Sequence, residues 1–215
     1  MREQVSAWIT EQKIVAIARG VRPEQMADTA EALYRGGIRS LEITFNQASD
    51  TGIVDTAESI RLAKKLLGDR MRIGAGTVMT IAQAEAAQEA GADFALAPNT
   101  DPKVIRRIVE LGMAAVPGAF TPSEIATAYE AGADIVKLFP AGNLGIDYVK
   151  AIRGPINHIP LMAVGGVNLD NTLDFLNNGF TSVGIGSNIV SLPLIQAEKW
   201  EELEALAAKY AELVK

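Results

Sequence analysis

Short apolar runs alternate with longer amphipathic segments along the whole chain. The short runs have the length of buried strands, and the longer segments show the hydrophobic spacing that is typical of helices. This pattern predicts eight strands, at residues 14–19, 40–45, 71–75, 93–97, 114–116, 134–139, 161–164 and 181–185. No linker rich in proline, glycine or serine interrupts the series, so we expect residues 1–215 to form a single domain that begins with a short helix.

The helices between these strands have recognisable starts and ends. Proline stands in the first turn at Pro23, Pro102 and Pro122, and an oxygen side chain that can cap the helix precedes the second and third of them. Five glycines close helical segments before a strand: Gly37, Gly91, Gly112, Gly132 and Gly179. Their spacing is equally consistent with a repeated unit and with ordinary capping.

Strands that alternate with helices predict an α/β fold with a parallel sheet. Eight strands and their crossover helices in 215 residues match a (β/α)8 TIM barrel near the lower end of its size range. A doubly wound open sheet is the alternative architecture.

Composition narrows the possible chemistry. The 20 basic and 26 acidic residues give a net charge of −6, which disfavours nucleic acid and membrane surfaces as partners. The chain has no cysteine and a single histidine, His158, so disulfides, thiolate nucleophiles and sites with several histidine ligands are excluded. The N-terminus carries no basic stretch followed by an apolar run, and we therefore expect a cytoplasmic protein.

Two charged residues stand within apolar strands. Leu41 and Ile43 form the helix-facing side of the second strand, which leaves Glu42 pointing into the barrel. By the same alternation Lys137 points inward from the sixth strand. Arg19 and Thr77 follow the first and third strands, so they reach the face on which barrel enzymes place their active sites.

A buried lysine loses its proton more readily than an exposed one, and the free amine attacks carbonyl carbons. Lys137 is therefore a candidate for Schiff-base chemistry, in which the iminium accepts the electrons of a breaking carbon–carbon bond. Glu42 is the available general acid and base. This chemistry needs neither a metal nor a cofactor. The alternative interpretation is a buried structural ion pair between the two side chains.

Glycine-rich turns follow the last two strands. Gly165 and Gly166 end the seventh strand, while Gly186 and Ser187 end the eighth and can open a short helix. Backbone N–H groups approach an anion closely where there is no Cβ atom, so these turns predict a phosphate site.

The chain as a whole resembles the class I 2-keto-3-deoxy-6-phosphogluconate and 4-hydroxy-2-oxoglutarate aldolases. The resemblance extends from about Lys13 to Val214 and rests on LEITFN (41–46), IGAGTV (73–78), LAPN (96–99), VPGAFTPSE (116–124), VKLFPA (136–141), VGGV (164–167) and GIGS (184–187). It implies a lyase of carbohydrate metabolism of the Entner–Doudoroff type. Such an enzyme cleaves 2-keto-3-deoxy-6-phospho sugar acids to pyruvate and glyceraldehyde 3-phosphate, or 4-hydroxy-2-oxoglutarate to pyruvate and glyoxylate.

The resemblance also implies roles for single residues and a homotrimeric assembly. Lys137 corresponds to the Schiff-base lysine and Glu42 to the acid and base, and the pyruvate half of the substrate is expected near Thr77, Pro98 and Phe139. The phosphate is expected at the turns at 165–166 and 186–187.

Two positions depart from the pattern of the gluconate enzymes. Asn46 stands where some members have an arginine that holds the substrate carboxylate, and Arg19 is expected to take over that role. Val164 stands where enzymes of the gluconate epimer often have threonine. Both features resemble the galactonate branch, and the lost hydroxyl is expected to alter epimer preference.

Two other functions remain open on the sequence. An isomerase or epimerase with a phosphate-binding barrel would use Glu42 as a base and Lys137 only as a charge. A sugar-phosphate binding protein without activity would keep the two as a structural pair.

Overall fold

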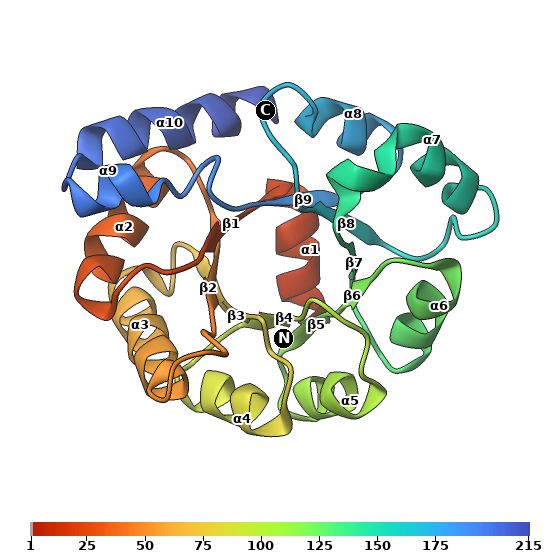
Figure 1. Cartoon of the computed structure of the whole chain (residues 1–215), viewed down its shortest axis with the longest axis horizontal. Coiled ribbons are helices and arrows are strands. Elements are labelled where there is room, and N and C mark those ends of the chain that lie inside the picture. Colours follow the sequence, from red (N-terminus) through yellow and green to blue (C-terminus); the bar gives the residue numbers. More distant parts are fainter. Residues whose placement is uncertain (1) are drawn as a thin grey trace.

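A ring of parallel strands surrounded by helices forms the centre of the computed structural model, which describes residues 2–215 (Figure 1). The strands are β1 Ile14–Ala18, β2 Ser40–Thr44, β3 Arg72–Gly76, β4 Phe94–Leu96, β5 Ala114–Val116, β6 Gly118–Ala119, β7 Val136–Leu138, β8 Leu161–Val164 and β9 Ser182–Ile185. All eight predicted strands agree with observed ones within two residues, and only β6 was not predicted. The expected (β/α)8 barrel is confirmed.

The fifth predicted strand is observed as β5, and an additional two-residue strand, β6, follows it. β5 pairs with β4 and β6 pairs with β7, and only Pro117 separates β5 from β6 along the chain. Proline has no N–H to give to a strand ladder, which explains the break. β1 pairs with both β2 and β9, and the two ends of the strand order, β5 and β6, are joined through Pro117, so the nine segments form a nearly closed ring and the open sheet is excluded.

Ten helices occur in residues 2–215: α1 Arg2–Gln12, α2 Pro23–Arg35, α3 Gly52–Leu67, α4 Ile81–Glu89, α5 Pro102–Glu110, α6 Pro122–Glu130, α7 Ala141–Arg153, α8 Thr172–Asn177, α9 Leu192–Gln196 and α10 Trp200–Leu213. The predicted caps are confirmed, because Asp101 accepts from the N–H of Lys103 and Thr121 from that of Glu124. The five closing glycines all have positive φ. Within the described residues, none of these helices combines the length and the apolar character that crossing a membrane requires.

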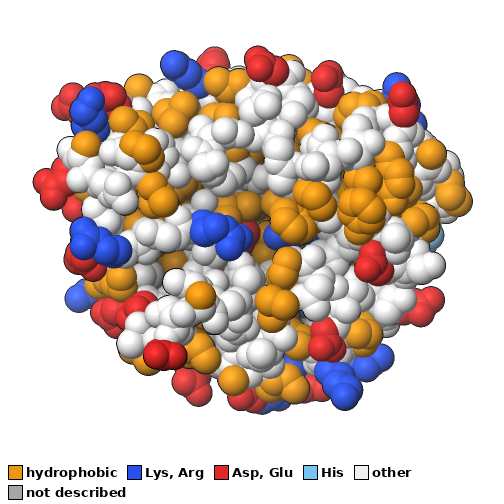
Figure 2. All heavy atoms as spheres, viewed as in Figure 1, with side chains coloured by type: hydrophobic (Ala, Val, Ile, Leu, Met, Phe, Trp, Pro, Cys, Tyr) orange, Lys and Arg blue, Asp and Glu red, His pale blue; other side chains and the backbone are white. Residues whose placement is uncertain are grey.

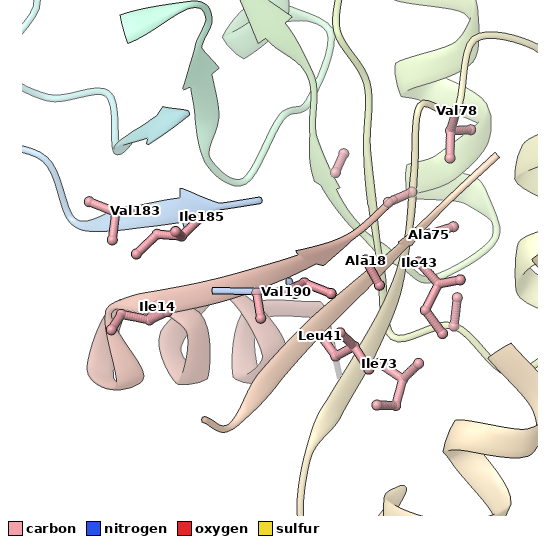
Figure 3. Close-up of a cluster of buried hydrophobic side chains, with 14 of the residues drawn as sticks. Ile14, Ala18, Leu41, Ile43, Ile73, Ala75, Val78, Val183, Ile185 and Val190 are labelled. Carbon is pink, nitrogen blue, oxygen red and sulfur yellow. The ribbon is translucent and has the colours of Figure 1, made fainter. Parts of the chain in front are cut away.

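Each strand sends alternate side chains to two separate cores. The larger core lies between the strands and the helices and includes Leu41, Ile73 and Val183 (Figure 3). The smaller core fills the inside of the barrel with side chains such as Phe94 and Met162. Two residues of α1, Val5 and Ile9, join this inner core, so the N-terminal helix closes one end of the barrel.

The inner core depends on glycine where large side chains need space. A Cβ atom on Gly74 would lie 2.3 Å from the ring of Phe94, which is fully buried. Real Cβ atoms do not approach other atoms so closely, so alanine at this position forces the ring or the strand to move. The ring of Phe94 on β4 thus fills the space that Gly74 on β3 leaves free.

We predict that Gly74→Ala lowers the free energy of unfolding by about 1–3 kcal/mol, because it overfills the inner core. Gly154→Ala is the matched control: its φ is −55°, in the helical region, its nearest contact would be 3.6 Å away, and its backbone suits alanine. The control should be neutral or stabilising by up to about 1 kcal/mol. Urea unfolding measures both, and equal effects of the two substitutions would contradict this packing.

Candidate active site

Glu42 and Lys137 both point into the barrel, as the strand alternation predicts. Glu42 comes from the middle of β2 and is 1% exposed, while Lys137 comes from β7 and is 4% exposed. The neighbours of Lys137 along β7, Val136 and Leu138, belong to the helix-facing core. Two ionisable groups are thus enclosed in an interior that is otherwise lined mainly by apolar side chains.

These two side chains do not form an ion pair. The ion pairs within residues 2–215 do not include Glu42 with Lys137, and both carboxylate oxygens of Glu42 are buried without a hydrogen-bond partner. Gly76 leaves the space that this carboxylate occupies, because a Cβ atom there would lie 1.7 Å from Oε1. A buried carboxyl without partners is costly for stability, so its retention indicates a chemical role rather than a structural pair.

Burial shifts the pKa values of the two groups toward each other. Loss of hydration raises the pKa of the Glu42 carboxyl, and the positive charges of Lys137 and Arg19 only partly oppose this rise. Burial likewise lowers the pKa of the Lys137 amine. The negative charge of Glu42 partly opposes this shift, and the positive charge of Arg19 adds to it. The site therefore favours a neutral amine beside a carboxyl group that can hold a proton.

Phe139 and Arg19 stand above these buried groups at the barrel mouth. The Lys137 Nζ atom lies 4.9 Å from the centre of the Phe139 ring, which is 37% exposed. Arg19 follows β1 and donates from Nη2 to Thr77 Oγ1 at 3.4 Å. Figure 2 shows the mouth as a hollow with hydrophobic and basic side chains around it. Arg19 is exposed there, so its guanidinium is available to an anion.

The predicted glycine turns line a cavity of about 440 Å³ next to Arg19. Gly165 and Gly166 have φ values of 88° and 76°, a region that side chains disfavour. The cavity is bounded by Arg19, Phe139, Val164, Gly165, Gly166, Gly186 and Ser187 among others. The structure therefore brings these seven predicted residues together.

The two buried ionisable groups do not line this cavity, two further predicted residues lie elsewhere, and two contributors were not predicted. Thr77 lines a second cavity of about 390 Å³, which it shares with Arg19. Pro98 is half-buried after β4, where its carbonyl lies against Gly118, outside both cavities. Asn188 donates to the carbonyl of Val167 at 2.8 Å and ties the two glycine turns together. In the sequence, only the position of Asn188 directly after Gly186 and Ser187 pointed to this role.

The backbone of Gly142, at the start of α7, also supports the first glycine turn. Its N–H donates to the carbonyl of Gly165 at 2.8 Å, and a Cβ atom there would lie 3.0 Å from that oxygen. The close approach requires glycine, which sequence spacing alone does not reveal.

We predict that Glu42→Gln lowers the pKa of Lys137 further, because it removes the negative charge that favours the ammonium form. Labelling of Lys137 by a neutral amine reagent such as fluorodinitrobenzene requires the free amine, so its rise with pH should begin at lower pH in the variant. Peptide mapping measures this, and the exposed Lys150 should show the same profile in both proteins. A Lys137 profile that moves to higher pH, or not at all, would contradict the coupling.

Comparison with known proteins agrees with this geometry. A family model for KDPG and KHG aldolases matches residues 5–206. The chain is 38% identical over 180 residues to a probable 2-dehydro-3-deoxy-6-phosphogalactonate aldolase of Rhizobium meliloti (strain 1021), a match that covers 83% of this chain and 82% of that one. It is 32% identical over 208 residues to the 2-dehydro-3-deoxy-6-phosphogalactonate aldolase of Escherichia coli (strain K12), covering 96% and 98% of the two chains.

A solved structure shows the same fold at lower identity. The KDPG aldolase of Legionella pneumophila, with pyruvate captured at low pH as a covalent carbinolamine intermediate, aligns with a TM-score of 0.84 at 28% identity, covering 94% of this chain and 96% of that one. With a family model that spans most of its length and relatives above 30% identity, this chain belongs to the KDPG and KHG aldolase family, whose members are lyases.

Proposed function

We propose that the chain is a class I aldolase that cleaves 2-keto-3-deoxy-6-phospho sugar acids to pyruvate and glyceraldehyde 3-phosphate. The observation that carries the proposal is the buried side chain of Lys137, which forms no ion pair, inside the same barrel as the unpaired carboxyl of Glu42. The names of its relatives, which are aldolases of phosphogalactonate and phosphogluconate type, support the substrate class. A relative named KHG/KDPG aldolase supports 4-hydroxy-2-oxoglutarate as a further substrate, cleaved to pyruvate and glyoxylate.

The proposed reaction begins with attack of the neutral Lys137 amine on the C2 ketone of the substrate. The carbinolamine takes up a proton and loses water to give an iminium. Glu42 then removes the proton of the C4 hydroxyl, the C3–C4 bond breaks, and its electron pair moves toward the iminium to form an enamine as the aldehyde leaves.

Glu42 completes the cycle by returning its proton to C3 of the enamine. Water then adds to the resulting iminium, pyruvate leaves, and the Lys137 amine is free again. A carboxyl whose pKa is raised by burial can carry a proton between these two steps. No step needs a cofactor or a metal ion.

Substrate binding is assigned to the groups around the barrel mouth. Arg19 is proposed to hold the carboxylate, since its guanidinium is exposed there and hydrogen-bonded to Thr77. Pro98 and Phe139 are proposed to flank the pyruvate half. The N–H groups of the turns at 165–166 and 186–187 are proposed to hold the phosphate, because glycine lets an anion approach the backbone.

We further propose that residues 1–215 act as one catalytic domain in a cytoplasmic homotrimer. Exposed aromatic side chains support an assembly: Phe120 is 43% exposed and its ring lies 6.3 Å from that of Tyr148, while Tyr129 is 41% exposed. Exposed apolar groups of this size are typical of protein contacts.

We predict that incubation with pyruvate and borohydride adds the mass of reduced pyruvate to Lys137. Lys137→Arg should abolish both the adduct and cleavage, because the guanidinium keeps a charge but has no free amine. Glu42→Gln should keep the adduct and slow cleavage about 10²-fold, since only proton transfer is impaired. Mass spectrometry and pyruvate release measure these effects. Cleavage without any adduct would instead support an isomerase-like role for Lys137, and binding without cleavage a non-catalytic protein.

We also predict that Val164→Thr changes the preference between epimers. Val164 lines the cavity, and a threonine hydroxyl there can contact a substrate hydroxyl, so kcat/KM for the gluconate-type substrate should rise relative to the galactonate type, by roughly tenfold. The natural chain should prefer the galactonate type. Pyruvate release from both substrates measures the ratio. A ratio that is the same in both proteins would remove Val164 from the determinants of specificity.

A further inference from the structure

Two glutamine side chains connect helix α4 to the backbone of Thr77 at the barrel mouth. Gln83 is 5% exposed, and its Oε1 accepts from the N–H groups of Met79 at 2.8 Å and Thr80 at 3.1 Å. Its Nε2 donates to Gln47 Oε1 at 2.9 Å. Gln47 Nε2 in turn donates to the carbonyl oxygen of Thr77 at 2.9 Å. A continuous hydrogen-bonded chain thus runs from the start of α4 to Thr77.

The direction of this chain is determined by its buried end. Both backbone partners of Gln83 are donors, so its oxygen must face them and its NH₂ group must face Gln47. Gln47 then has to present its oxygen to Gln83, which leaves its NH₂ group for the Thr77 carbonyl. The cap of α4 therefore selects the orientation of an amide that lies beside the candidate active site.

Thr77 needs such support because of its backbone conformation. Its φ is 57°, a left-handed value that β-branched residues adopt only where their surroundings hold them in it. This conformation places the hydroxyl so that it accepts a hydrogen bond from Arg19 at 3.4 Å. Thr77 directly follows Gly76, which makes room for the Glu42 carboxylate, so its position affects both ends of the site.

We propose that Gln47 and Gln83 are positioning residues that hold Thr77, and through it the Arg19 guanidinium, in the orientation that binds the substrate carboxylate. This inference rests on the proposed aldolase function. Arg19, Gln47 and Thr77 line one cavity of about 390 Å³ together, which places the hydrogen-bonded glutamines next to the guanidinium that is proposed to hold the carboxylate.

Two substitutions interrupt the hydrogen bonds from Gln83 through Gln47 to Thr77 at different points. Gln83→Glu keeps the helix cap, as α6 demonstrates: Glu124 accepts from the N–H groups of Phe120 at 2.9 Å and Thr121 at 2.8 Å in the same kind of capping box. It replaces the donor to Gln47 by a carboxylate oxygen, so Gln47 has to turn its NH₂ group toward residue 83 and away from Thr77. Gln47→Met keeps the length of the side chain and leaves the cap intact, but it removes the donor to Thr77.

The experiment follows borohydride trapping of pyruvate on Lys137 in the full-length protein. Both variants should raise the pyruvate concentration for half-maximal trapping roughly three- to tenfold, which corresponds to one hydrogen bond, and leave the maximal rate nearly unchanged. The double variant should need no higher pyruvate concentration than the more strongly affected single variant, because either change alone breaks the same series of hydrogen bonds. Trapping of acetone, a ketone without a carboxylate, should be unaffected.

Other results would overturn the inference. Unchanged half-maximal pyruvate concentrations in both variants would reject the positioning role while the wild-type adduct still supports the aldolase. A parallel loss of acetone trapping, or a lower Tm in both variants, would show a merely structural role. A wild-type chain without any Lys137 adduct would overturn the proposed function and the positioning role with it.

Discussion

The barrel encloses an amine and a carboxyl group that form no ion pair with each other, and the rest of the structure accommodates this costly burial. Lys137 and Glu42 have almost no exposure, and neither compensates the other through a direct ion pair. Such groups destabilise a protein, so their retention indicates that its chemistry requires them. The consequence is an amine with a lowered pKa and a carboxyl with a raised one, and these are the two properties that a Schiff-base aldolase uses.

The rest of the barrel keeps these groups enclosed. Val5 and Ile9 of α1 close the end away from the site, and Phe94 and Met162 fill the middle. Gly76 leaves space for the carboxylate of Glu42. At the open end, Arg19 and the glycine turns offer a positive charge and backbone donors, and these are the groups proposed to bind an anionic substrate despite the net charge of −6.

Much of this arrangement could be predicted from local pattern. Strands have a side-chain period of two, so the apolar neighbours Leu41 and Ile43 were sufficient to direct Glu42 inward, and Val136 with Leu138 did the same for Lys137. The glycine turns carried a signal of their own because left-handed backbone favours glycine. The strand β6 after Pro117 was missed because its two residues are too few to show an alternating pattern, and only its pairing with β7 identifies it as a strand.

Features that depend on distant contacts had no such signal. The contact between Gln47 and Gln83 joins positions 36 residues apart, and the hydrogen bond from Asn188 to Val167 joins positions 21 apart. The left-handed conformation of Thr77 is equally invisible, since threonine rarely adopts it. These contacts become apparent only when the barrel brings the ends of its strands together.

The most direct test of this account is an NMR titration of the Lys137 side chain in protein labelled with ¹³C and ¹⁵N lysine, its signal assigned by its absence from Lys137→Arg. The account predicts a pKa for Lys137 clearly below the ordinary lysine value of ~10.4. A pKa at or above that value would show a hydrated or ion-paired ammonium. It would contradict the buried amine of lowered pKa from which the proposed chemistry is derived.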